Sequence, residues 1–209
     1  MGHVAEAPLV AGFSLGIALA GAPGPVQAVL LAESMRGGIA RGFRALAGAS
    51  LTFAALLFSL ALGLSVVTPG AVTLRILQIV GGTFLVWLAV DAFRSGHEVD
   101  ETSAPRRSLS PIARGSLAIL LNPGGWLFLG AVASPLFAEA GRSAGRAGAL
   151  LAAVALIAGL AIGDGAIVLL GGIGLRRARR SVIVWTGHIL AAALAALGMW
   201  LLVQGLTQS

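Results

Sequence analysis

The sequence predicts an all-α integral membrane protein with six transmembrane helices, arranged as two inverted three-helix repeats. Three observations favour this fold class. Of the 209 residues, 57% are apolar and only 11% are charged, whereas a soluble domain carries roughly 25% charged residues. Six apolar runs are long enough to cross a bilayer. Interruptions that contain Gly and Pro occur at matching places in the two halves.

Each predicted span needs about 20 mostly apolar residues. In chain order, the six runs lie at about 8–32, 45–67, 74–93, 115–138, 147–171 and 182–205. The connections between them are short, except for a charged segment that we interpret as a solvated cytoplasmic linker. We expect one membrane domain over residues 1–209, with repeat 1 at about 8–94, the linker at about 95–114 and repeat 2 at about 115–205.

The arginines predict the orientation of the chain. The first, third and fifth connections carry most of them, namely Arg36, Arg41, Arg44, Arg94, Arg106, Arg107, Arg114, Arg176, Arg177, Arg179 and Arg180. The second and fourth connections carry Arg75, Arg142 and Arg146. The positive-inside rule places the arginine-rich connections in the cytoplasm and both termini outside. Because each repeat has three spans, the second repeat runs inverted relative to the first.

Composition also limits the chemistry. The chain has no Cys, which excludes disulfide frameworks, thiolate metal sites and thiol redox chemistry. The net charge of +6 is explained by topology arginines, so we expect the lipid bilayer as a partner and no nucleic acid. No cluster of His residues is visible, and we expect no metal site.

Two interruptions of the apolar runs mark the candidate site. The first is Gly21-Ala22-Pro23-Gly24-Pro25, and the second is Asn122-Pro123-Gly124-Gly125. Such breaks free backbone N–H and C=O groups, which lipid cannot satisfy, so they survive only inside protein or beside a polar cavity. Matched breaks in two halves indicate the binding site of a secondary transporter. The predicted pathway therefore includes Gly24, Pro25, Asn122 and Pro123.

Asp164 is the most informative single residue, because apolar residues flank it on both sides within the fifth run. A carboxylate at the centre of a membrane helix costs about 2.5–3.5 kcal/mol on insertion scales and is a functional candidate for that reason. It could bind a substrate ammonium group or carry a coupling proton. The structural alternative is a hydrogen bond to a backbone group freed at one of the breaks.

Neighbouring groups suit a zwitterionic solute. Gln27 and Asn122 lie beside the two breaks and can either orient a polar substrate or cap freed backbone groups. The helix N-termini that follow Pro25 and Pro123 present N–H groups and partial positive charge, which suits a carboxylate. An amino acid would match this set of groups.

Charged residues near the ends of the spans have a simpler interpretation. Glu33 with Arg36, and Asp91 with Arg94, have the i, i+3 spacing of helical ion pairs. As an alternative, Glu33, Asp91 and Arg36 could form a charged vestibule at the mouth of a cavity. His188, the only His within a span, is predicted to make a packing hydrogen bond between helices.

Several motifs together resemble the lysine-exporter (LysE/RhtB) family of bacterial amino-acid efflux transporters. They are Pro23-Gly24-Pro25, the basic Gly-rich stretch Gly37-Gly38-Ile39-Ala40-Arg41-Gly42, Gly48-Ala49, Asn122-Pro123 and Asp164. The resemblance implies export of amino acids or similar small metabolites, driven by the proton gradient without another cofactor. It also implies a multi-pass protein of the bacterial inner membrane. Such a protein could form a homodimer.

The chain departs from the family pattern at two places. Many relatives have a polar or charged residue after the first Gly-Pro and a Lys after Asn-Pro, where this chain has Val26 and Gly124. The identity of the substrate therefore stays open.

Other functions remain as alternatives. A related six-span fold could export a metal ion or a small amine, although the few intramembrane acids disfavour a metal. A non-transport membrane scaffold is disfavoured by Asp164, whose charge costs free energy without a role. A serine hydrolase using Ser14 and His188 lacks a third group and a nucleophile elbow. We therefore do not expect an enzyme.

Overall fold

The computed structural model describes residues 3–22, 24–63, 70–95, 109–174 and 180–207. These residues form helices and turns, with no strand among them. In chain order the helices are α1 (His3–Gly21), α2 (Pro25–Ala61), α3 (Ala71–Ser95), α4 (Pro111–Leu120), α5 (Pro123–Phe128), η1 (Leu129–Ala133), α6 (Ser134–Leu169), η2 (Leu170–Gly174) and α7 (Arg180–Thr207). The two η elements are single π-helical segments.

Within the described residues, four helical segments are long and apolar enough to cross a membrane. They are Pro25–Ala61, Ala71–Asp91, Pro123–Ile173 and His188–Thr207. Two shorter apolar helices, Glu6–Gly21 and Pro111–Leu120, accompany them. The protein is therefore an all-α protein with multiple candidate membrane spans.

Both predicted breaks are present in the fold. At the first, α1 ends at Gly21 and α2 begins at Pro25, with Gly24 in an extended conformation (φ −163°, ψ −178°). At the second, α4 ends at Leu120 and α5 begins at Pro123. Proline favours the first position of a helix, because its fixed φ fits and its missing N–H would have no intrahelical partner there.

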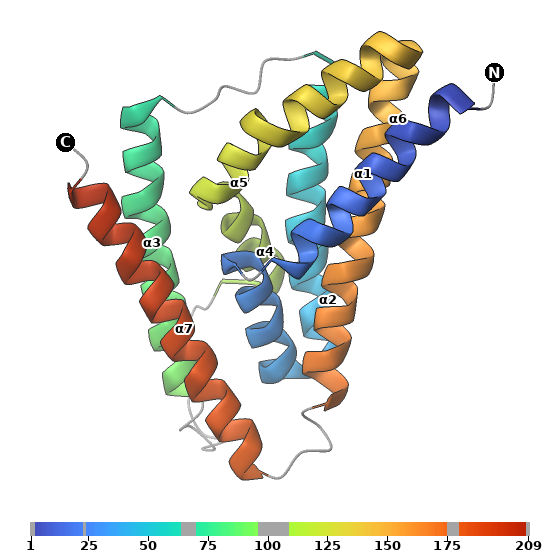
Figure 1. The fold of residues 1–209 in the computed structure, drawn as a ribbon. Coiled ribbons are helices and arrows are strands. Elements are labelled where there is room, and N and C mark those ends of the chain that lie inside the picture. Colours follow the sequence, from blue (N-terminus) through green and yellow to red (C-terminus); the bar gives the residue numbers. More distant parts are fainter. Residues whose placement is uncertain (1–2, 23, 64–69, 96–108, 175–179, 208–209) are drawn as a thin grey trace.

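Two further features were not predicted, and they replace loops that we expected in the first and fourth connections. Helix α2 reverses direction at Gly37 (φ −141°, ψ 19°) and Gly38 (φ 74°, ψ −173°). Helix α6 does so at Ala144 (φ −134°, ψ 19°) and Gly145 (φ 64°, ψ −166°). Positive φ favours glycine because it has no Cβ. Figure 1 shows the α2 reversal in the lower half of the view, above the start of α7, and the α6 reversal at the top.

Glycines allow helices from different halves to pack closely. Helix α1 lies along α6, and α4 lies against α2. A Cβ on Gly16 would overlap the carbonyl oxygen of Leu156, and a Cβ on Gly115 would overlap that of Ala45. Small residues at such crossings let backbones approach within a membrane. The first helix of each half thus packs on a long helix of the other half.

This packing gives a stability prediction. We expect Gly115→Val to lower the midpoint of thermal unfolding in detergent markedly, because overpacking costs about 1–3 kcal/mol or more when backbone must move. Gly141→Val is the matched control, since a Cβ on Gly141 meets nothing within 4 Å. Equal midpoints for the two variants would contradict the close contact between α4 and α2.

Helices α3 and α7 form a separate pair beside the other helices (Figure 1). Gly82 and Gly198 bring them together, because a Cβ on Gly82 would lie 2.7 Å from the carbonyl oxygen of Gly198. Helix α3 has few contacts with α2 and α5. The pair is therefore joined to the rest of the protein over a limited area.

Helix α4 begins before the C-terminal end of the predicted linker. Residues 96–108 lie outside the described residues, but α4 already begins at Pro111, with Ser110 Oγ accepting a hydrogen bond from Ala113 N at 3.2 Å. Arg114 belongs to this helix and is only 1% exposed. A residue that we interpreted as part of a solvated linker is thus among the most buried in the protein, for reasons given below.

Candidate functional site: a cavity between the helix breaks

The two breaks lie around one cavity of about 250 Å³. Helices α1, α2, α4, α5 and α6 contribute to its wall. The lining residues are Leu19, Ala22, Gly24, Pro25, Val26, Gln27, Phe53, Ile119, Asn122, Gly124, Gly125, Phe128, Leu160 and Asp164. The wall is mostly apolar with a few polar groups, as in typical small-molecule sites.

Asp164 supplies the charge in this cavity. Its side chain is only 2% exposed, and Gln27 Nε2 donates a hydrogen bond to Asp164 Oδ1 at 3.3 Å. Among the described lining residues, Asp164 is the only ionisable one. Asp164 therefore has a side-chain partner beside the first break. Sequence positions 137 residues apart are joined by this contact.

Asn122 closes the second break. Its side-chain Oδ1 accepts a hydrogen bond from Gly124 N at 3.0 Å, so that it caps the N-terminus of α5. Its amide group therefore has a structural task as well as a place in the cavity wall. Pro123 is buried and begins α5, and it is not among the lining residues. Gly124 and Gly125 line the cavity and leave it without a side chain at this point.

The first break differs from the second in its capping. Gly24 offers no side-chain cap to α2, and Pro25 has no N–H. The following N–H groups, of Val26 and Gln27, lie in the first turn, where a helix has no intrahelical acceptors. Partial positive charge therefore accumulates beside the cavity, on the same helix as the amide that contacts Asp164.

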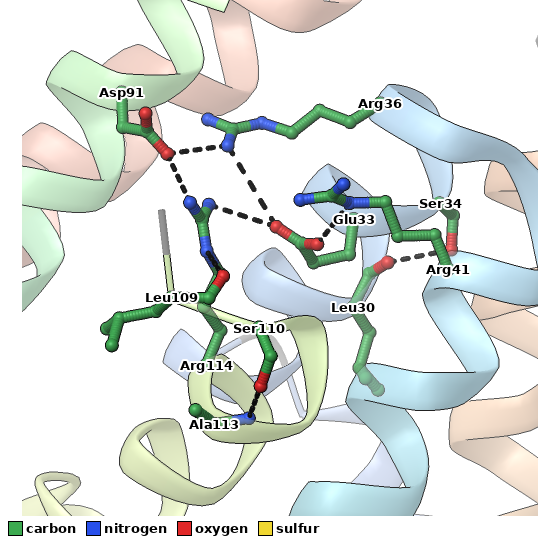
Figure 2. Close-up of polar contacts among 10 residues, drawn as sticks. All are labelled: Leu30, Glu33, Ser34, Arg36, Arg41, Asp91, Leu109, Ser110, Ala113 and Arg114. Atoms are coloured by element: carbon green, nitrogen blue, oxygen red, sulfur yellow. Dashed lines mark hydrogen bonds and ion pairs between the residues drawn. The ribbon is translucent and has the colours of Figure 1, made fainter. Parts of the chain in front are cut away.

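A second group of polar residues lies farther along α2. We call Glu33, Arg36, Arg41, Asp91 and Arg114 the charged network (Figure 2). Glu33 is 1% exposed and contacts Arg41 Nε at 2.6 Å and Arg114 Nη1 at 3.0 Å. Asp91 contacts Arg36 Nη1 at 2.6 Å and Arg114 Nη2 at 2.7 Å. Helix α2 has two arms, one before and one after the reversal at Gly37–Gly38. The network therefore links both arms of α2 with α3 and α4.

The sequence predicted only part of this network. The Glu33–Arg36 pair is present, but at 4.0 Å it is the longest of the ion pairs of Glu33. The side chain of Arg94, the expected partner of Asp91, lies outside the described residues. Arg41 and Arg114 were assigned to topology alone, because their contacts with Glu33 join residues that sequence spacing does not relate. The candidate vestibule residues Glu33, Asp91 and Arg36 do lie together.

Other candidate residues lie away from both groups. The ring of His188 packs against that of Phe93 in a tilted arrangement, with 5.0 Å between the ring centroids, where α7 meets α3. Within the part of the chain that the structure describes, no group of three or more His, Cys, Asp or Glu residues could hold a metal ion.

Fold and cavity together define the class: an α-helical, multi-pass membrane protein with a small cavity where its helices are interrupted. The profile of the family described as LysE type translocator matches residues 17–205. The chain therefore belongs to this family of translocators, which move small molecules across membranes and are not enzymes. Searches of curated proteins and of solved structures gave no match.

Proposed function

We propose that this protein exports amino acids or similar small metabolites in exchange for protons, and that the cavity between the breaks is the substrate site. The observation that carries the proposal is the position of Asp164. It is buried inside a candidate membrane-spanning segment, lines the cavity and contacts Gln27, which lies beside the first break. A buried carboxylate in such a segment is costly, and proton or substrate binding explains why it is there.

The groups around Asp164 support a zwitterionic substrate. The carboxylate would bind the substrate ammonium, and the uncapped N-terminus of α2 would receive the substrate carboxylate. Apolar residues such as Phe53, Ile119 and Phe128 would contact the remainder of the solute. A volume of about 250 Å³ suits a compact molecule of this kind.

Protonation of Asp164 would compete with ammonium binding, because both neutralise the same carboxylate. A proton that enters from outside would release the substrate there, and loss of the proton to the cytoplasm would restore the site. This exchange couples the two movements without a second ionisable group in the cavity.

We further propose that the helical segments complete six spans in two inverted repeats. On this interpretation, α1 with the first arm of α2 forms span 1, and α4 through the first arm of α6 forms span 4. The similar dihedral angles at Gly37–Gly38 and Ala144–Gly145 support it. The charge bias then gives an inner-membrane protein with both termini outside.

A small amine is the second candidate substrate. The described cavity wall contains a carboxylate and no Lys or Arg side chain, so an amine without a carboxylate could also bind. An efflux screen with purified protein in liposomes, over amino acids and matched decarboxylated amines, distinguishes the two. We expect pH-gradient-driven efflux of an amino acid. Efflux of amines alone would favour the second candidate, and no efflux of either class would contradict the proposed function.

A further inference from the structure

We propose that the charged network is a gate that closes the transport path between the cavity and the α2 reversal at Gly37–Gly38. This inference rests on the proposed function for the existence of a path, and its test below needs no substrate. In the inverted-repeat topology, the gate faces the cytoplasm and must open before substrate reaches the cavity.

The network joins α3 to α2 and α4, with which α3 otherwise has few contacts. Asp91 on α3 holds Arg36 of α2 at 2.6 Å and Arg114 of α4 at 2.7 Å. Trp87, one turn earlier on α3, stacks over the guanidinium of Arg114, with 5.3 Å from Cζ to the ring centroid. Because α3 packs mainly along α7, these contacts account for much of its attachment to α2 and α4 at this level.

The space beneath the network is closed. Along α2, Val29 and Leu30 lie between the cavity and Glu33, and they are 2% and 0% exposed. The gap between α2, α3, α4 and α7 at this level has no room for a water molecule. It is lined by Val29, Ala32, Glu33, Arg36, Leu88, Arg114 and Leu194. A solute in the cavity therefore cannot pass in this direction unless these helices separate.

Ion pairs suit a plug that must open to water. When the helices separate, Glu33, Asp91 and Arg114 lose their ion-pair partners and become hydrated. Hydration offsets the lost attraction. An apolar plug would instead expose apolar surface, at a cost of about 25 cal/mol per Å². The network thus fixes one closed arrangement of the helices while keeping the free-energy cost of opening small.

Glycine places both arms of α2 in the gate. Arg41 follows the reversal and reaches back to Glu33 at 2.6 Å. A Cβ on Gly42 would overlap Ser34 Oγ, so the arms lie closely side by side. The α2 reversal therefore forms a compact unit, and the gate would open or close as Asp91 of α3 releases or contacts it.

The absence of Cys from the chain gives a direct test. A Val29→Cys reporter lies in the closed gap, and its alkylation by a membrane-impermeant thiol reagent measures opening from either side of the membrane. We expect slow labelling from both sides. In Val29→Cys/Asp91→Asn, labelling from the α2-reversal side should rise on the order of tenfold, the equivalent of one hydrogen bond to a charged group.

Matched variants separate gating from damage. Asp91→Glu should restore slow labelling, and Arg36→Gln should raise it as Asp91→Asn does. Glu139→Gln removes an exposed carboxylate that pairs with Arg142 and should have no effect. Equal labelling with and without Asp91→Asn, or a rise from both sides together, would overturn the gate. Loss of transport with intact gating would instead count against the proposed function.

Discussion

Asp164→Asn should strongly reduce proton-coupled efflux while the protein still folds and inserts. The substitution keeps the size of the side chain and its ability to contact Gln27, but it removes the charge that binds ammonium or proton. A hydrogen bond to a charged group contributes about 1.5–3 kcal/mol, so we expect efflux to fall on the order of ten- to a hundredfold. Radiolabelled efflux from proteoliposomes under an imposed pH gradient measures it.

The controls test the role of Asp164 specifically. Glu139→Gln removes a carboxylate that is about two-thirds exposed, and it should leave efflux unchanged. Gln27→Ala removes the partner of Asp164 and retains the charge, so it should impair efflux less than Asp164→Asn. Wild-type coupled efflux and counterflow in Asp164→Asn would remove this residue from the mechanism.

Glu33→Gln should have the largest effect on stability. Glu33 is 1% exposed and pairs with Arg41 and Arg114, and Arg114 is equally buried. Neutralising one partner of a buried ion pair costs about 3–5 kcal/mol, and here it would leave Asp91 as the one carboxylate of the network beside three arginines. We therefore expect a large fall in the midpoint of thermal unfolding, measured in detergent.

A double-mutant cycle isolates the pair. Arg114→Gln alone should also destabilise the protein, and Glu33→Gln/Arg114→Gln should recover part of the loss, because neither charge is then left without the other. Glu139→Gln serves as the exposed control. Strictly additive losses in the double variant would show that Glu33 and Arg114 are not coupled.

The sequence indicated the residues that interrupt a membrane helix or place a charge inside it. Proline and glycine at the two breaks, and the carboxylate of Asp164, are exceptions that a bilayer permits only for a reason. Matched breaks in two halves indicated that they would meet at one site, and they line one cavity. The apolar wall was not predicted, because Phe53 or Ile119 looks like any other apolar residue of a span.

The charged network shows where sequence reasoning stopped. Arginine near a span end is normally a topology signal, and nothing in the spacing of Arg114 relates it to Glu33, 81 residues earlier. The reversals at Gly38 and Gly145 were hidden for another reason. Helix continues on both sides of a positive-φ glycine, so a short polar connection and a helical reversal have the same composition.

If the cavity between the breaks is the substrate site, the transported solute should occupy it and shield its wall. Two single-cysteine variants that retain transport, Val26→Cys at the first break and Gly124→Cys at the second, test it most directly. We expect the transported solute to slow alkylation at both positions, with half-protection near the concentration that half-saturates transport. Gly141→Cys should be unaffected. Undiminished alkylation at both positions, under conditions where the solute is transported, would show that the solute does not bind in this cavity.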